Sequence, residues 1–331
     1  MRILVLGGTG VISRAIISEG IKAGHEMIAL NRGKREAQFQ VLPEIIRADW
    51  SDENMYREKT RGLDVDVVID MLSRTPEDAE RTLACFGGKT HQWIFTSTCC
   101  AYKKPIQSFP IRESEAELWN DPIYTYPYEK ARMEQFLFTR QPEDREPITV
   151  IRPSLTYGEG CSNIGILRQN INVFRRIQAG KPLLVFDEGK TIFTFTFAPD
   201  LARGYLACCL NPKAYGEAFH IVSRNQMDFA SYYLCFGKIV GCEPTFVTID
   251  SEALYNLDPV QFEHIWFEKR FDHIFSIDKI KSAAPEWEPE ITLEDGLRHM
   301  LVWWEEQNIE PLKEKDELED KLCALGKPLE G

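Results

Sequence analysis

Residues 2–32 read RILVLGGTGVISRAIISEGIKAGHEMIALNR, and this segment gives the clearest indication of the fold. It opens on a short apolar run, turns at a cluster of glycines, and continues with helically spaced apolar residues as far as Gly24. A second apolar run spans Glu26 to Leu30. Short apolar runs predict buried strands, and spacings of three and four residues predict a helix. The stretch therefore predicts a strand–helix–strand unit.

The same alternation continues along the first half of the chain. Further apolar runs lie at 44–46, 65–69, 92–95 and 148–151, and polar helical stretches lie at 75–86 and 126–139. Strands that alternate with helices form mostly parallel sheets covered on both faces. We therefore predict an α/β fold with a Rossmann-type, doubly wound parallel sheet.

Composition narrows the class of protein. The chain has 331 residues, 44% of them hydrophobic and 27% charged, as in a folded globular protein. Its 39 basic and 51 acidic residues give a net charge of −12, which disfavours nucleic acid and anionic membranes as partners. The nine cysteines contain no CxxC pair, and no apolar run is long enough for a membrane span. We expect a cytoplasmic protein with free thiols.

The glycine cluster predicts a dinucleotide site because it follows a strand and opens a helix. Gly7 permits the tight turn, and Gly10 lets the backbone approach a pyrophosphate at the helix N-terminus. Ser13 stands where a third glycine is usual and is small enough for close packing. The predicted cofactor contacts in this turn are Gly7, Thr9, Gly10, Val11 and Ile12.

The end of the second strand reads Asn31-Arg32-Gly33-Lys34, where the residue that contacts the adenosine ribose is expected. Arg32 can pair with a 2′-phosphate, so NADP(H) is favoured and NAD is the second choice. The alternative is an ordinary exposed arginine. Asp49 is expected to accept from the adenine amino group or to cap a helix. The predicted cofactor set also includes Asn31, Trp50, Met71, Leu72 and Pro153.

The sequence after residue 155 alternates less regularly. We expect residues 1–155 to form the dinucleotide-binding domain, completed by segments at about 194–222. Residues 156–193 and 223–307 are expected to form an interleaved substrate domain, and residues 308–331 a charged, solvated helical tail. Arg175 and Arg176 are interpreted as a solvated helix face, with binding of a substrate diphosphate as the alternative.

A tyrosine and a lysine stand four residues apart in the segment Tyr126-Pro127-Tyr128-Glu129-Lys130. On a helix this spacing places both side chains on one face. A nearby ammonium stabilises a phenolate, so Tyr126 could exchange a proton with a substrate hydroxyl while hydride moves to the cofactor. Lys130 would also bind the nicotinamide ribose.

Several motifs in order resemble the extended short-chain dehydrogenase/reductase family, the NAD(P)-dependent epimerase/dehydratase group. They are the glycine loop, Asp49 and the segments FTSTCCAY (95–102), YPYEK (126–130), RPSLTYGEG (152–160) and FTFAPDLAR (195–203). The resemblance implies a catalytic triad of Thr98, Tyr126 and Lys130, with Thr98 four residues before Tyr102. It also implies a homodimer through the helix that carries Tyr126. The LNRGK segment (30–34) is similar to an atypical subgroup that includes relatives of plastid RNA-binding proteins.

Two cysteines follow Thr98 where sugar-nucleotide dehydratases carry an Asp-Glu pair, so elimination of water by that route is disfavoured. Cys100 is interpreted as a small residue beneath the nicotinamide. The alternative is an acid/base role, which in similar enzymes involves a histidine of the substrate domain; here the first histidine after Lys130 is His220, in a predicted strand. The histidine spacing predicts no metal site.

Together these features predict an oxidoreductase that transfers hydride between NADP(H) and a carbinol or carbonyl of a sugar or sugar-nucleotide. One alternative is a redox-neutral epimerase with tightly held NAD. The other is a non-catalytic nucleotide- or RNA-binding member of the fold, which the intact triad and the charge of −12 disfavour.

Overall fold

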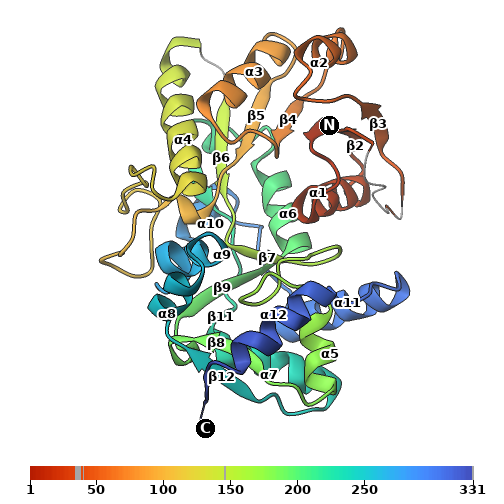
Figure 1. Cartoon of the computed structure of the whole chain (residues 1–331). Coiled ribbons are helices and arrows are strands. Elements are labelled where there is room, and N and C mark those ends of the chain that lie inside the picture. Colours follow the sequence, from red (N-terminus) through yellow and green to blue (C-terminus); the bar gives the residue numbers. More distant parts are fainter. Residues whose placement is uncertain (34–38, 40, 145–146, 330–331) are drawn as a thin grey trace.

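The structure is a computed structural model that describes residues 1–33, 39, 41–144 and 147–329. Its larger half contains a seven-stranded sheet in the order β10-β6-β5-β4-β1-β2-β3, in which all neighbours pair in parallel (Figure 1). This confirms the predicted Rossmann-type sheet. Its strands are β1 (Arg2–Leu6), β2 (Glu26–Asn31), β3 (Glu44–Arg47), β4 (Val67–Asp70), β5 (Gln92–Thr96), β6 (Ile148–Arg152) and β10 (Ala218–His220).

Helices cover both faces of this sheet because its strands are apolar on both sides. In β1, Ile3 and Val5 pack in one core cluster, whereas Leu4 and Leu6 pack in the other. One face is covered by α1 (Val11–Lys22), α6 (Ala198–Cys208) and α10 (Asp278–Ala283). The opposite face is covered by α2 (Glu53–Thr60), α3 (Pro76–Phe86) and α4 (Thr125–Asp144).

The smaller half contains two three-stranded sheets, seen in the lower part of Figure 1. The first is ordered β11-β9-β7, with β7 (Leu155–Tyr157), β9 (Ile192–Phe197) and β11 (Gln226–Asp228). The second is ordered β13-β12-β8, with β8 (Leu183–Phe186), β12 (Phe246–Ile249) and β13 (Lys327–Pro328). The other elements are α5 (Asn172–Gln178), α7 (Phe229–Val240), α8 (Ser251–Leu257), α9 (Pro259–His264), a π-helical turn η4 (Ile265–Lys269), α11 (Leu293–Glu306), α12 (Lys313–Cys323) and the short 3₁₀ turns η1 (Cys99–Ala101), η2 (Asp187–Gly189) and η3 (Pro212–Ala214).

The chain crosses between the halves several times. Within the 194–222 segment, α6 packs on α1 and β10 joins the large sheet, whereas β9 belongs to a small sheet. The domain boundaries proposed from sequence remain a prediction.

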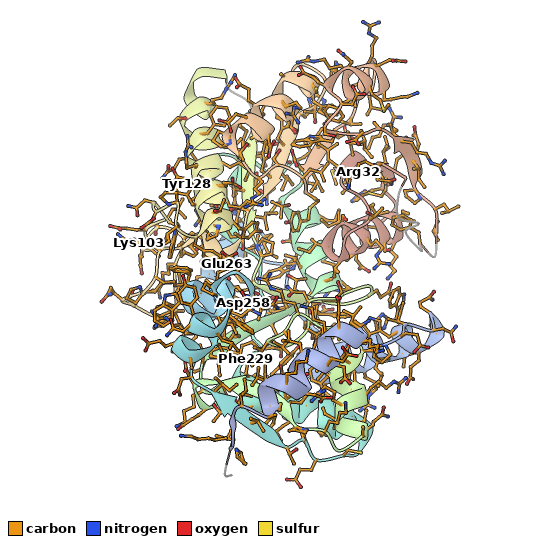
Figure 2. The ribbon with its side chains drawn as sticks, in the orientation of Figure 1. Arg32, Lys103, Tyr128, Phe229, Asp258 and Glu263 are labelled. Atoms are coloured by element: carbon orange, nitrogen blue, oxygen red, sulfur yellow. The ribbon has the colours of Figure 1, made fainter. Side chains whose placement is uncertain are left out.

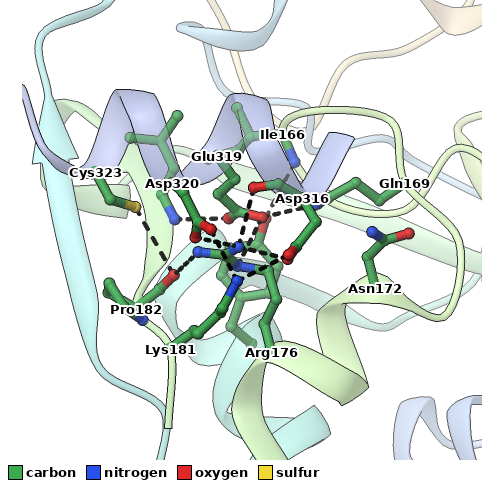
Figure 3. A network of polar contacts seen from close by, with 12 residues as sticks. Ile166, Gln169, Asn172, Arg176, Lys181, Pro182, Asp316, Glu319, Asp320 and Cys323 are labelled. Atoms are coloured by element: carbon green, nitrogen blue, oxygen red, sulfur yellow. Dashed lines mark hydrogen bonds and ion pairs between the residues drawn. The ribbon is translucent and has the colours of Figure 1, made fainter. Parts of the chain in front are cut away.

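The charged C-terminal segment docks on the smaller half, contrary to the expectation of a solvated tail. Arg176 of α5 is buried and pairs with three acidic residues of α12, as Figure 3 shows. The ion-pair distances are 2.6 Å to Asp316, 3.1 Å to Glu319 and 2.8 Å to Asp320. The interpretation of Arg176 as part of a solvated face was therefore wrong, because the acidic face of α12 covers it.

All nine cysteines are free thiols. Among the described residues, no helix combines the length and apolar character that a membrane crossing requires.

Candidate active site

The sheet order reverses between β1 and β4, and two cavities lie at the carboxyl ends of the neighbouring strands. Such a crevice is where open α/β sheets bind ligands. Gly7 lines both cavities. Figure 2 marks Arg32 in the half that contains the large sheet and Phe229 in the smaller half.

The first cavity, of about 330 Å³, brings together residues from four strand ends, those of β1, β2, β3 and β4. It is lined by seven of the predicted cofactor residues, namely Gly7, Thr9, Asn31, Arg32, Asp49, Trp50 and Leu72. The Arg81 guanidinium lies 4.5 Å from the centre of the Trp50 ring, and this cation–π contact stabilises the position of the Trp50 side chain in the cavity wall. Asp49 accepts hydrogen bonds from the backbone and hydroxyl of Ser51, at 3.0 and 2.6 Å. The helix cap considered for Asp49 is instead Asp52, which accepts from Met55 N. Lys34 lies outside the described residues.

The glycine turn has the geometry that a phosphate cradle needs. Gly7 has φ of +84°, and a Cβ there would lie 2.7 Å from Leu72 Cδ2. Ser13 Oγ accepts from Gly10 N at 2.9 Å and donates to Gly7 O at 2.8 Å, so the serine fastens the turn where a third glycine is usual. The first N–H groups of a helix have no intrahelical acceptor and, with the helix dipole, favour an anion. Gly10, Val11 and Ile12 line the second cavity at this end of α1.

The second cavity, of about 490 Å³, contains all three predicted catalytic residues, Thr98, Tyr126 and Lys130. Met71 and Pro153 line it too, so every predicted site residue lies in one cavity or the other. Thr98 follows β5 and accepts from Cys100 N at 3.1 Å. Tyr126 lies in the first turn of α4 and keeps 39% of its surface exposed.

Different surroundings shift the pKa values of Lys130 and Tyr126. Lys130 Nζ donates to the carbonyl oxygens of Ser73 and Thr96, both at 2.7 Å, and burial lowers the pKa of Lys130 to about 8. Loss of solvent, followed by the neighbouring Cys100 and Glu268, raises the pKa of Tyr126, against the lowering effect of Thr98 and Arg74. In the protein alone, the Tyr126 phenol is therefore neutral at pH 7.

Tyr102 lies in a buried network away from the cavity. Its hydroxyl is 2.6 Å from His220 Nε2 and 2.6 Å from Arg152 Nη1, and Arg152 pairs with the buried Glu134. Burial, and next Arg152, lower the pKa of His220 to about 3. His220 is thus a neutral core histidine, and its ring forms hydrogen bonds with Tyr102 and with the Ser276 carbonyl.

Sequence reasoning missed the wall of the second cavity that the smaller half contributes. Cys100 Sγ lies 2.8 Å from Glu268 Oε1, and Tyr124 Oη lies 3.1 Å from Glu268 Oε2. Lys269, Arg168 and His273 line the same cavity. No motif marks these residues, and 168 positions separate Cys100 from Glu268.

Comparison with known proteins identifies the family. A family model described as the NAD dependent epimerase/dehydratase family matches residues 3–221, about two thirds of the chain. The chain belongs to this family. That result confirms the resemblance inferred from the motifs.

Among the similar members of the epimerase/dehydratase family is the 2′-dehydrokanamycin reductase of Streptomyces kanamyceticus, 23% identical over 87% of this chain and 80% of that protein. The chloroplast stem-loop binding protein of 41 kDa b from Arabidopsis thaliana is 27% identical over 89% of this chain and 77% of that protein. In fold, the UDP-glucose 4-epimerase of Thermotoga maritima, solved with UDP-glucose, superposes with a TM-score of 0.73 at 19% identity, over 93% of this chain and all of that one.

The cavities fit the NAD(P) that members of this family use. The tight turn at Gly7 and the exposed end of α1 suit a pyrophosphate, and the first cavity offers Trp50 and Asp49 to an adenosine. Among the described residues, no cluster of His, Cys, Asp and Glu has the arrangement of a metal site.

Proposed function

We propose that the protein is an NADP(H)-dependent oxidoreductase that transfers hydride to or from a carbinol or carbonyl carbon of a sugar or sugar-nucleotide. One observation carries this proposal: Thr98, Tyr126 and Lys130 line the same cavity as the N-terminus of α1. Arg32, in the adjoining cavity, supports NADP(H) over NAD because a guanidinium pairs with a 2′-phosphate.

Each of the three residues has a proposed task. Thr98 hydrogen-bonds the reacting oxygen, and Tyr126 exchanges a proton with it. Lys130 is held by two carbonyl groups in a position to bind ribose hydroxyls and to favour ionisation of Tyr126. The nicotinamide, when bound, supplies or accepts the hydride.

The names of the relatives support the substrate class. One similar protein is named a 2′-dehydrokanamycin reductase, and a protein of like fold is a UDP-glucose 4-epimerase solved with UDP-glucose. A redox-neutral epimerase with tightly held NAD would use the same triad. The similarity to a stem-loop binding protein favours RNA binding as a further candidate, against which the net charge of −12 counts.

The decisive experiment titrates the purified protein with NADPH and NADH by nicotinamide fluorescence, using wild type, Arg32→Ala and Tyr126→Phe. We expect tighter binding of NADPH, a loss of that preference in Arg32→Ala, and unchanged NADPH affinity in Tyr126→Phe with turnover abolished. Retained turnover in Tyr126→Phe would exclude the proposed proton shuttle. Equal binding of both cofactors would remove the NADP(H) assignment.

The reductase, epimerase and RNA-binding functions can be distinguished by cofactor consumption, isotope exchange and gel shift. A reductase consumes NADPH in proportion to product, whereas an epimerase exchanges isotope into the substrate without net consumption. RNA binding predicts a gel shift that weakens with salt, and no shift at low salt would exclude it.

A further inference from the structure

Arg74 lies in the turn between β4 and α3 and contacts the ring of Tyr126. Its guanidinium carbon is 5.3 Å from the centre of that ring, which is a cation–π distance. Glu129, one turn further along α4, forms an ion pair with Arg74 and so holds the guanidinium in this place. The proposed function gives Arg74 no task, although the residue touches the proposed proton shuttle.

The backbone around Arg74 is fixed on both sides. Asp70, at the end of β4, accepts hydrogen bonds from Ser73 N at 2.8 Å and from Ser73 Oγ at 2.6 Å. Asp78 of α3 accepts from Arg74 N at 3.1 Å. The carbonyl oxygen of Ser73 in turn accepts from Lys130 Nζ. One turn of the chain therefore fixes the lysine of α4 and also presents a guanidinium to the same helix.

Lys130 does not keep its charge at every pH at which a phenolate forms. Burial, more than any nearby charge, lowers the pKa of Lys130 to about 8, so its ammonium loses the proton above that pH. A guanidinium, in contrast, is not deprotonated in proteins. Arg74 also lowers the pKa of Tyr126, which burial raises most. Above pH 8, Arg74 is thus a permanent positive charge beside the phenol.

The other titratable groups near Tyr126 come from several elements. They are Lys130 and Glu129 of α4, Cys100 of η1, Glu268 of η4 and Tyr205 of α6. Cys100 and Tyr205 are neutral near pH 8, because burial raises the pKa of each. Arg74 and, while it is protonated, Lys130 therefore oppose the effect of the Glu268 carboxylate on the phenol.

We propose that Arg74 is a positioning residue that acts through Tyr126: its guanidinium, held over the ring by Glu129, stabilises the Tyr126 phenolate once Lys130 has lost its proton. The inference rests on the proposed function for the role of Tyr126 as the proton shuttle. It goes further by assigning part of the control of that shuttle to a residue outside the predicted triad. A site that relied on Lys130 alone would lose its positive charge near pH 8.

The test follows ionisation of the phenol directly and needs no substrate. The analogue 2,3,5,6-tetrafluorotyrosine, whose phenol is more acidic than that of tyrosine, replaces Tyr126 alone. Its ¹⁹F signal is titrated from about pH 4 to about pH 10, in the protein alone and with saturating NADP⁺. A nearby cation favours the charged form of a phenol, so its removal raises the midpoint. We expect Arg74→Gln to raise the midpoint by about 0.5 to 1 pH unit.

Two further variants show whether the charge at this position is the cause. Arg74→Lys keeps a positive charge beside Glu129, and we expect its midpoint to stay within about 0.2 pH unit of wild type. The matched control is Arg132→Gln. Arg132 lies 5.8 Å from the ring centre of Tyr128, which Figure 2 labels on the same helix, and we expect its removal to leave the midpoint unchanged.

Each contrary result has a distinct meaning. An unchanged midpoint in Arg74→Gln would overturn the inference. Equal rises in Arg74→Gln and Arg74→Lys would overturn it too, because the charge would then not be the cause, and so would equal rises in Arg74→Gln and Arg132→Gln. If the phenol of wild type with NADP⁺ stays protonated throughout the titration, the result contradicts instead the proposed function, in which Tyr126 is the proton shuttle.

Discussion

At the scale of single residues, the contact between Cys100 and Glu268 determines how the thiol behaves. Burial raises the pKa of Cys100 most, and the charge and hydrogen bond of Glu268 raise it further. The thiol is therefore neutral at pH 7 to 8 and a poor nucleophile, since the thiolate is the reactive form.

We predict that Cys100 reacts slowly with iodoacetamide at pH 7.5 and that Glu268→Gln accelerates the reaction about tenfold. The variant removes a negative charge, and one pKa unit of lowering gives ten times more thiolate. The rate is measured by mass spectrometry of the peptide that contains residue 100. Tyr124→Phe is the control, because it removes a hydrogen bond to Glu268 and keeps the carboxylate charge. Equal acceleration in both variants would show that access, and not charge, controls the rate.

The sequence was informative about residues whose role depends on local backbone. The glycine turn, the strand ends and the Tyr126–Lys130 spacing all act within one or two elements, and all predicted residues line the two cavities. Glu268 and Lys269 could not be found in this way. They reach the cavity through the packing of a π-helical turn that lies far along the chain, and neither stands in a spacing typical of a site.

At the scale of elements, α12 shows how a charged helix can be part of the core. Its acidic residues face Arg176, and Glu319 also accepts from Leu184 N at 2.9 Å and from Gln169 at 2.6 Å. A high density of charge predicts solvent exposure, but here the opposite charge sits on α5, 140 positions earlier. The pattern of α12 alone therefore predicted the helix correctly and its surroundings wrongly.

We predict that Arg176→Met destabilises the protein by about 3 to 5 kcal/mol, because it leaves the buried Glu319 without its counter-charge. Urea unfolding measures the loss, and hydrogen exchange should show α12 opening first. Arg175→Met is the matched control. Arg175 pairs with Glu305 at the surface, where such a pair contributes less than about 1 kcal/mol. A loss in Arg176→Met as small as that in Arg175→Met would mean that the buried network adds no more to stability than a surface ion pair.

At the scale of the whole molecule, three buried histidines couple folding to pH. Burial, followed by nearby cations, lowers the pKa of His220 to about 3 and that of His264 to about 2, and it places His273 well below its ordinary value. In the unfolded chain, each titrates near 6.5. Below that pH the unfolded state binds more protons than the folded state, so the stability present above pH 6.5 is lost as the pH falls.

We predict that the free energy of unfolding decreases between pH 6 and pH 5 by up to about 1.4 kcal/mol for each buried histidine. Urea titrations at several pH values give the slope. His264→Gln should reduce the dependence of the unfolding free energy on pH by the contribution of one buried histidine. His91→Gln, at an exposed position, should leave that dependence unchanged. A slope that is the same in wild type and His264→Gln would contradict the assignment.

The route of the chain between the sheets has a consequence for synthesis on the ribosome. After β6 the chain builds β7, β8 and β9 in the smaller half before β10 returns to pair with β6. Until residue 220 has emerged, β6 is an open edge of the large sheet, and such edges recruit other chains. In the smaller half, β8 likewise lacks its parallel partner strand until β12 has been synthesised. The two halves therefore cannot fold independently in succession, and the nascent chain is most exposed to misassembly while residues 153–217 are being made.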